Sequence, residues 1–373
     1  MSRPVALLLT PVRPDAAGNG LARRAWRWAV ELAADYELSS IVIASYAGAA
    51  DGRTQVPGRV VVLHHARQGK RGLLDWVDPG PDLSMEVQAA LPEQKPARVI
   101  VFRAGLHDVA ALLPPAWRDV CEMDFDDWES ATRRSLARLA LRHGLWQLAW
   151  RQRRAAARYA ALEREMLRYY ESVHLAAPED AERLRALMPG GRIICSPNRI
   201  VPVQTIQVRD AARRVLFVGT LGYLPNLDAA LWLARGLAPA LRRVAPGVEF
   251  IVAGAAPPGL AKKLRRAGID CHAFPADPSA LYASAAIAVA PLRGGGGTKV
   301  KILEAWAHRR PVVATSHAAR GLGAVPGRDL LIADTAEQFS LCCKRIFDDP
   351  ALAASLADAG HARLRECFLL PVV

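Results

Sequence analysis

The sequence predicts an α/β protein with two doubly wound domains, each a parallel sheet covered by helices on both faces. The chain has 373 residues, and a single hydrophobic core rarely extends beyond roughly 250–300 residues. Hydrophobic residues make up 51% of the chain and charged residues 23%, which suits a globular enzyme and excludes a disordered protein. Short aliphatic runs alternate with helical patterns in both halves, as strand–helix–strand units require.

The first half begins with this alternation. Each of its predicted strands is a short run of branched aliphatic residues between polar residues, glycine or proline. A helix is predicted between the first two strands, and helical patterning dominates from about 130 to 186. The predicted strands are 5–9, 40–44, 60–63 and 98–102, and the helix is 21–35. We place the domain boundary between 205 and 206, after the proline-containing loop that starts at Ser196.

The second half repeats the pattern. Strands are predicted at 215–218, 249–253, 286–290, 311–314 and 330–332, and helices at 227–241, 259–267, 300–307, 337–347 and 351–365. Ligands of open parallel sheets bind at the carboxyl ends of the strands. Two such domains are therefore expected to face each other across a ligand-binding cleft.

A glycine-rich loop between the strand 286–290 and the helix 300–307 is the strongest local signal. Gly294 to Gly297 let the backbone approach a ligand closely, and Thr298 is a good N-cap. The helix N-terminus offers N–H groups and a positive dipole end to an anion, and Lys299 and Lys301 add two charges. Glu304 follows on the same helix and suits a ribose diol. We interpret the loop as a diphosphate site; the alternative is a tight turn.

Other candidates lie in loops after predicted strands. A second glycine turn holds Gly219 and Gly222 and is followed by Asn226. The turn Gly18-Asn19-Gly20 follows the first strand. A third segment, 123–130, is rich in carboxylates and includes Asp124 and Asp126; it could cap a helix, supply a base or bind a metal. His107 and His317 each follow a strand.

A basic segment explains much of the net charge of +13. Residues 130–162 contain eight arginines and no acidic residue, interleaved with Trp146 and Trp150. Three interpretations stay open: a solvated helix face with its tryptophans packed inward, an anionic membrane surface, or nucleic acid. The six cysteines show no metal-ligand spacing, and no signal peptide or apolar span is recognised. We therefore expect reduced thiols and a cytoplasmic protein. Peripheral attachment to the inner face of the membrane is the alternative localisation.

The second half resembles family 4 of the glycosyltransferases, which are retaining enzymes of the GT-B fold. The likeness rests on Phe217-Val-Gly219 with Pro225-Asn226, on Val252-Ala-Gly254, on 290–305 and on 311–322. It is specific over 215–335 and looser before about 195. The resemblance implies two Rossmann-like domains: an acceptor-binding one at 1–205 and a nucleotide-sugar-binding one at 206–373.

The resemblance also assigns roles. Glu304 matches the second glutamate of the family's E-x7-E motif, which contacts the ribose, whereas the first falls at Gly296. The catalytic role of stabilising the departing diphosphate is implied for Lys299, Lys301 and Arg293. The remaining donor-site residues are Gly219, Asn226, Phe274, Gly295, Gly296, Gly297 and Thr298, and the loop from the opposite domain contributes Gly18, Asn19, Gly20, His107 and Asp126.

The expected activity is sugar transfer from a nucleotide-diphosphate sugar to a hydroxyl acceptor, and the resemblance suggests bacterial surface polysaccharide or glycoconjugate synthesis as its setting. We expect no metal and no cofactor, since the nucleotide sugar is itself the donor. The expected partners are a glycan, lipid-linked or small-molecule acceptor and a membrane surface along 130–162, but not nucleic acid. The alternatives are a non-catalytic GT-B scaffold, which the loss of the acid at Gly296 favours, and a nucleotide-sugar epimerase.

Overall fold

The computed structural model describes residues 3–44, 49–52, 54–65, 76–203, 213–273, 275 and 277–370. The chain divides into two compact units. The first contains Met1–Arg134 and Trp150–Arg199, and the second contains Ser135–Ala149 and Ile200–Val372. The predicted boundary at 205/206 falls outside the described residues. The segment Ser135–Ala149 groups with the second unit, although it precedes that boundary by many residues.

The first unit is built on a parallel sheet. Within the described residues it has seven strands in the order β3-β2-β1-β4-β5-β6-β7. They are β1 (Val5–Thr10), β2 (Glu37–Ala44), β3 (Arg59–His64), β4 (Arg98–Phe102), β5 (Cys121–Asp126), β6 (Ser172–Leu175) and β7 (Ile193–Cys195). The central strands β1 and β4 are buried almost throughout, which explains their continuous aliphatic sequences.

The second unit repeats this architecture. Its described residues form a six-stranded parallel sheet in the order β10-β9-β8-β11-β12-β13. The strands are β8 (Arg214–Val218), β9 (Glu249–Ala253), β10 (Asp270–His272), β11 (Ile287–Ala290), β12 (Val312–Ala314) and β13 (Leu331–Ile332). A continuous hydrophobic core includes Phe217, Phe250 and Trp306.

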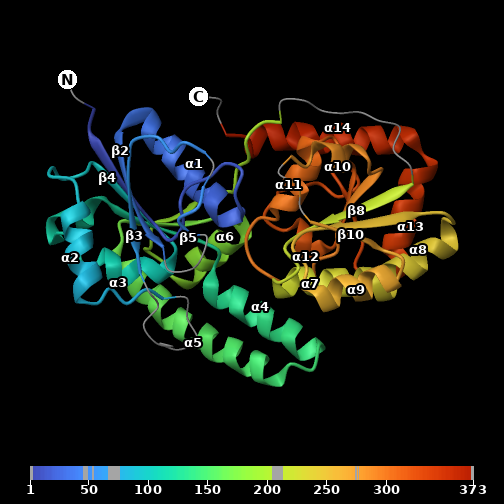
Figure 1. The fold of residues 1–373 in the computed structure, drawn as a ribbon, viewed down its shortest axis with the longest axis horizontal. Helices are drawn as coiled ribbons and strands as arrows, with labels where there is room; N and C mark the ends of the chain where they lie inside the picture. The colour runs from blue at the N-terminus through green and yellow to red at the C-terminus, as the bar shows by residue number, and fades with distance from the viewer. Residues whose placement is uncertain are drawn as a thin grey trace. The chain divides into compact units, whose positions relative to one another are not determined.

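Helices cover each sheet (Figure 1). Along the first part of the chain they are α1 (Gly20–Asp35), α2 (Pro81–Ala90), α3 (His107–Ala110), α4 (Glu129–Arg142), α5 (Trp146–Tyr169) and α6 (Pro178–Leu187). In the second unit they are α7 (Leu224–Trp232), α8 (Ala238–Val244), α9 (Pro258–Arg266), α10 (Ser279–Ala283), α11 (Val300–Ala307), α12 (Ser316–Ala319), α13 (Ala336–Asp348) and α14 (Pro350–Cys367). Their starts follow local chemistry: Asn19 caps α1, and Thr335 with Gln338 forms a capping box on α13.

Each strand order reverses once, and this reversal positions the candidate sites. In the first sheet the reversal lies between β1 and β4, and in the second between β8 and β11. The loops that leave neighbouring strands in opposite directions at such a point open a crevice at the carboxyl edge of the sheet. The Gly219 turn follows β8 and the glycine loop follows β11, so both lie at the reversal point of the second unit.

Several sequence-based expectations need correction. The segment 123–130 was not expected to contain a strand, but Cys121–Asp126 is strand β5, and the arginine-rich helix α4 starts at Glu129. Strand β6 interrupts the helical stretch expected up to 186, and β7 and β10 were not predicted. The single helix expected at 227–241 is α7 and α8 joined by a π-helical turn at Leu233–Leu237. The basic segment is two helices, α4 and α5, separated by a turn in which Gly144 has a φ of 69°.

In the part of the chain that the structure describes, no helix is both long and apolar enough to cross a bilayer.

Candidate functional site

The glycine loop takes a backbone path that requires glycine. Gly295 has a φ of 104° and Gly297 a φ of 61°, both in the left-handed region that other residues rarely occupy. Gly294 packs so closely that a Cβ there would lie 2.5 Å from Leu139 Cδ1. The Gly295 N–H donates a hydrogen bond to Ser135 Oγ at 3.0 Å. The segment Ser135–Ala149 therefore supports the loop within the second unit.

Lys299 lies at the junction of the loop and α11. Its Nζ donates hydrogen bonds to the carbonyls of Gly296, at 2.6 Å, and Gly297, and the side chain is buried. Lys299 also holds the N-cap position of α11 without a capping side-chain hydrogen bond. The expectation that Thr298 would cap this helix is therefore wrong by one residue. Lys299 draws the loop carbonyls together and brings a positive charge to the start of the helix.

Lys301 connects the two loops at the reversal point. Its Nζ donates to Asn226 Oδ1 at 2.6 Å and lies 4.5 Å from the centroid of the Phe217 ring. Asn226 in turn donates from Nδ2 to the Thr220 carbonyl at 3.0 Å. A Cβ on Gly219 would lie 2.8 Å from Asn226 Cγ, so glycine leaves room for this link. The structure thus brings together three residues that the sequence assigned to one site.

The charge of Lys301 is poised near neutral pH. Its pKa is lowered to about 7, mainly by burial, which the charge of Glu304 opposes and that of Lys299 reinforces. A dianionic or trianionic ligand beside Nζ would favour the protonated form. Binding of such a ligand should therefore be coupled to proton uptake by Lys301.

Glu304 lies on α11 and is partly exposed. Tyr282 donates from its hydroxyl to Glu304 Oε2 at 3.2 Å, and its ring stacks on His308 with centroids 4.6 Å apart. These contacts orient the carboxylate from a third element, α10. Tyr282 was not predicted as a site residue, because nothing in its sequence context marks it as polar support for a carboxylate.

Arg293 is held by a buried carboxylate. Its guanidinium bonds Asp228 twice, at 2.6 and 3.0 Å, and lies 4.7 Å from the Trp232 ring centroid. Asp228 is fully buried and is also 2.8 Å from His143 Nε2. Arg293 thus serves a local ion pair in this state. Asp228 and His143 were missed because they lie far apart in the sequence.

His317 packs against the glycine loop from α12. Burial lowers its pKa to about 4, and the charges of Lys299 and Arg320 contribute, while hydrogen bonding to the backbone of Gly294 and Gly295 opposes the shift. Its Nε2 is buried and has no hydrogen-bond partner among the described residues. The ring is therefore neutral at physiological pH.

The residues predicted in the first unit are engaged in structural contacts. Asn19 Oδ1 accepts from the Ala22 N–H at 3.1 Å as the cap of α1, with Gly18 and Gly20 on either side. His107 is buried among aromatic rings, and its Nδ1 lies 2.9 Å from the Tyr170 hydroxyl. This is the environment of a core histidine.

Asp126 borders a buried ion-pair network in the first unit. Asp124 accepts two hydrogen bonds of 2.7 Å from Arg24 and one of 2.5 Å from Trp28. Asp126 lies 3.4 Å from Arg24 and 3.6 Å from Arg103. Burial lowers the pKa of Arg24, but the nearby carboxylates, Asp124 first among them, together have the larger effect, so the pKa of Arg24 is raised. Asp124, Asp126 and Glu129 of this segment thus form ion pairs with arginines.

One predicted residue cannot be placed. Phe274, which the resemblance assigns to the donor site, lies outside the described residues. The roles implied for the other site residues stay predictions, because the structure contains the chain alone.

Comparison with known proteins finds a family match for part of the chain. Residues 212–349 match the family model described as glycosyl transferases group 1. A protein of Klebsiella pneumoniae, described as an uncharacterized 44.6 kDa protein in the cps region, is 31% identical over 129 residues. That match covers 32% of this chain and 33% of the relative, so it spans about a third of each protein.

Solved structures resemble nearly the whole chain. A sucrose-phosphate synthase from Thermosynechococcus elongatus is similar with a TM-score of 0.71 and 16% identity, over 98% of this chain and 95% of that one. Anabaena HepE, solved with UDP and glucose, has a TM-score of 0.64 and 17% identity, over 98% and 96% of the two chains. Staphylococcus aureus TarM has a TM-score of 0.56 and 10% identity, over 76% and 55%. The chain has the GT-B fold, and its residues 212–349 match the family model of the glycosyl transferases group 1.

Proposed function

We propose that this chain is a retaining glycosyltransferase that moves a sugar from a nucleotide-diphosphate sugar to a hydroxyl acceptor. The observation that carries the proposal is the loop pair at the strand reversal of the second unit. The glycine loop and the Gly219 turn are joined there by the Lys301–Asn226 hydrogen bond. The glycine backbone and the two lysines suit a diphosphate, and the oriented glutamate suits a ribose, so together they suit a nucleoside diphosphate.

In the proposed reaction, the diphosphate lies against the glycine loop with Lys301 beside it. The bond between the sugar C1 and the phosphate oxygen breaks while the acceptor oxygen bonds to C1 from the same face. The acceptor proton passes to the departing diphosphate, so no protein base is needed. Lys299 and Lys301 stabilise the charge that develops on the leaving group, and such electrostatic stabilisation is commonly the largest contribution to catalysis. Glu304 binds the ribose.

The relatives suggest which ligands to test first. HepE has been solved with UDP and with UDP-glucose, which supports a uridine nucleotide as the first donor to test. The Klebsiella relative is encoded in a cps region, which supports a role in the synthesis of a bacterial surface polysaccharide. We infer a hydroxyl of a glycan or lipid-linked sugar as the acceptor.

Thermal unfolding with a panel of UDP, GDP, dTDP and their sugars tests the proposal. A ligand at about 100 times its Kd stabilises the folded state by about 2.7 kcal/mol, which is a clear shift in Tm. We expect one nucleotide to shift the Tm of the wild type, and Glu304→Ala to lose most of that shift. Glu86→Ala is the matched control, because Glu86 is an exposed glutamate on α2 of the first unit.

A non-catalytic scaffold is the second candidate, favoured by Gly296 in place of the acid that the family resemblance leads us to expect. The two candidates differ in a simple measurement. An enzyme releases nucleoside diphosphate from the nucleotide sugar that shifts its Tm, slowly to water and faster with an acceptor. A chain that shows no Tm shift with any member of the panel would favour the scaffold and contradict the proposed activity.

A further inference from the structure

One face of α5 displays tryptophan to solvent. Trp146 is 71% exposed and Trp150 is 57% exposed, and Leu145 just before the helix is 42% exposed. The two tryptophans are four residues apart, so the geometry of the helix itself places them on one face. The interpretation that packed these rings inward is therefore wrong. Large exposed apolar side chains that cluster in this way mark an interaction surface.

The opposite face of α5 already has its partners. Ala155, Ala156, Tyr159 and Met166 are buried. Glu163 is buried as well, and it accepts hydrogen bonds from the Trp128 indole N–H at 3.0 Å and from the Ser130 backbone N–H at 2.8 Å. The buried side of the helix thus explains how α5 packs against the rest of the unit. Because Glu163 lies on this side, the first acidic residue after the basic segment is not at the surface. The face that carries Trp146 and Trp150 takes no part in this packing and is exposed.

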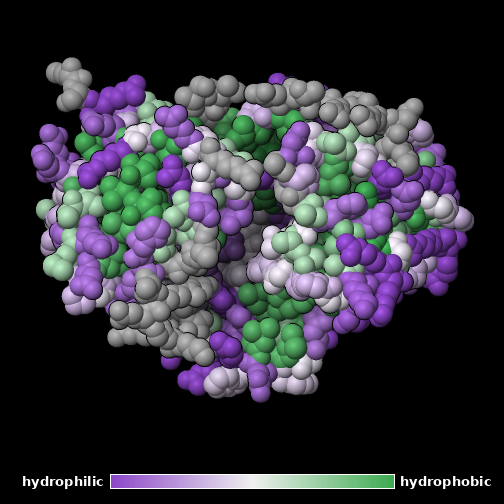
Figure 2. All heavy atoms as spheres, in the orientation of Figure 1, coloured by the Kyte–Doolittle hydropathy of each residue, from purple (hydrophilic) through white to green (hydrophobic). Residues whose placement is uncertain are grey.

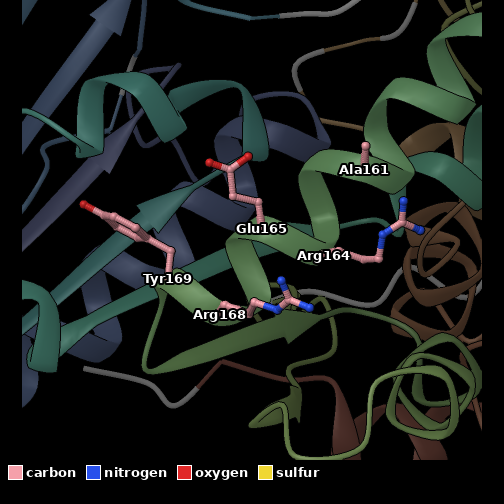
Figure 3. A pocket seen from close by; sticks show the side chains of 5 residues that line it. All are labelled: Ala161, Arg164, Glu165, Arg168 and Tyr169. Atoms are coloured by element: carbon pink, nitrogen blue, oxygen red, sulfur yellow. The ribbon is translucent and has the colours of Figure 1, made fainter.

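The exposed face is also strongly basic. Arg151, Arg153, Arg154 and Arg158 of α5 are all exposed, as is Arg142 at the end of α4, and no acidic residue occurs from 130 to 162. The Arg154 guanidinium lies 4.8 Å from the Trp150 ring centroid, so charge and aromatic ring share one patch. Further along, Arg164 and Arg168 line a shallow hollow of about 420 Å³ with Glu165 and Tyr169 (Figure 3). The helix has 24 residues, so the face is about 36 Å long.

We propose that this face of α5 binds the surface of a bilayer that contains anionic lipids. Tryptophan prefers the headgroup level, where its ring is buried and its N–H stays hydrated. Arginines beside it bind lipid phosphates, each contributing to attraction by a negatively charged leaflet. The apolar cluster of Leu145, Trp146 and Trp150 at one end of the helix favours a membrane over nucleic acid, since phosphates would satisfy the arginines and leave this cluster in water. The proposal goes beyond sugar transfer and does not depend on it.

The test is co-sedimentation of the full chain with vesicles of phosphatidylcholine alone or mixed with phosphatidylglycerol. We expect binding to the anionic vesicles and little binding to the neutral ones. Trp146→Ser with Trp150→Ser should weaken binding at least about tenfold, since two rings lose their burial. The charge variant Arg151→Gln, Arg153→Gln and Arg154→Gln should weaken it by about a hundredfold at low salt.

Helix α9 supplies a matched control. Lys262, Lys263 and Arg266 are exposed there, and hydrophilic side chains gather over this helix (Figure 2). Changing these three to Gln removes the same charge from a face without tryptophan and should change vesicle binding by no more than about twofold. All variants should keep the wild-type Tm shift with nucleotide, which separates this proposal from the proposed function.

Three results would overturn the proposal. The wild type could fail to bind anionic vesicles, or the tryptophan variant could bind them as well as the wild type. The α9 variant could lose as much binding as the α5 charge variant, which would reduce the effect to net charge. A parallel measurement with a DNA duplex covers the other partner class: tight binding that the α5 charge variant loses, without vesicle binding, would assign the face to nucleic acid.

Discussion

The two units share a topology but use the reversal point of their sheets differently. In the first unit, charged side chains near this edge neutralise each other: Arg24 and Asp124 are both buried and share two hydrogen bonds. In the second unit, the same edge holds the Arg293–Asp228 ion pair, but it also holds glycines and Lys301, which donates a hydrogen bond to the neutral Asn226 Oδ1. A charge satisfied by its counter-ion serves stability, whereas a cation held by neutral groups retains its attraction for an anion.

This difference explains why the strand reversal of the first sheet holds a structural ion pair, whereas that of the second sheet is a candidate ligand site. The pKa of Arg24 is raised by its partner, and that of Asp124 is lowered because Arg24 outweighs the effect of burial. The pKa of Lys301 moves the opposite way, down to about 7. The first pair stabilises the fold, and the second group costs stability until a ligand arrives.

The largest expected effect is on the first unit. Asp124→Asn removes the carboxylate that bonds the buried Arg24 twice and leaves only Asp126, at 3.4 Å, as a counter-charge, which should lower the free energy of unfolding by about 3 kcal/mol. Denaturant unfolding followed by circular dichroism measures it. The exposed pair Lys95–Asp119 is the control, and Lys95→Ala should cost only about 0–1 kcal/mol. Equal small losses for both variants would remove the structural role of the buried pair.

Lys301→Met should show the reverse pattern. Loss of a charge-assisted contact should weaken nucleoside diphosphate binding by about 10–100-fold. The free energy of unfolding at neutral pH should stay level or rise by about 1–2 kcal/mol, because a partly buried cation with a lowered pKa is removed. Titration calorimetry and thermal unfolding give the two values. If the variant is destabilised by several kcal/mol and still binds nucleotide normally, Lys301 is a structural residue.

The next effect is on pH dependence. The pKa of His317 is about 4 in the folded chain and about 6.5 when unfolded, so the unfolded state binds more protons between these values. Its contribution to stability is present above about pH 6.5 and is lost as the pH falls toward 4. His317→Gln should flatten this decline by about 2 kcal/mol between about pH 7 and 5. Parallel pH profiles for variant and wild type would show that His317 does not titrate in this way.

The smallest effect tests the link between the two loops. Gly219→Ala places a Cβ within 2.8 Å of Asn226, which must turn away from Lys301. We expect a loss of about 1 kcal/mol in stability and a several-fold weaker nucleotide affinity. Gly222→Ala is the control in the same turn, because no atom lies within 4 Å of a Cβ there, and it should be neutral within about 0.5 kcal/mol. Indistinguishable variants would mean that the Asn226 link does not matter.

The fold was largely predictable because its signals are local. The strands β4 and β9 and the helix α11 have the predicted boundaries, since a buried aliphatic run ends where polar residues, glycine or proline begin. Strand β5 was missed because its buried Asp124 looks like a surface residue in the sequence. A carboxylate can occupy a buried strand only when a distant residue such as Arg24 neutralises it, and sequence spacing does not reveal that pairing.

In the candidate site, too, the residues marked by the local sequence were predictable, whereas those brought in by the tertiary fold were not. The glycine loop, Lys299, Lys301 and Glu304 lie within a few residues of each other, so the motif itself revealed them. Ser135, Asp228 and Tyr282 come from α4, α7 and α10, and they reach the loop only through the tertiary fold. The exposure of Trp146 and Trp150 was undecided by the sequence, because either face of an arginine-rich helix can carry the aromatic residues.

Hydrogen–deuterium exchange of the whole chain, with and without the nucleoside diphosphate that shifts its Tm, tests the central claim most directly. The amides of bound loops exchange more slowly, so the ligand marks its own site. We predict the strongest protection over residues 219–226 and 294–304 in the second unit, with β5 around Asp124 unchanged. A saturating ligand that leaves 294–304 unprotected would contradict the assignment of the donor site to the glycine loop.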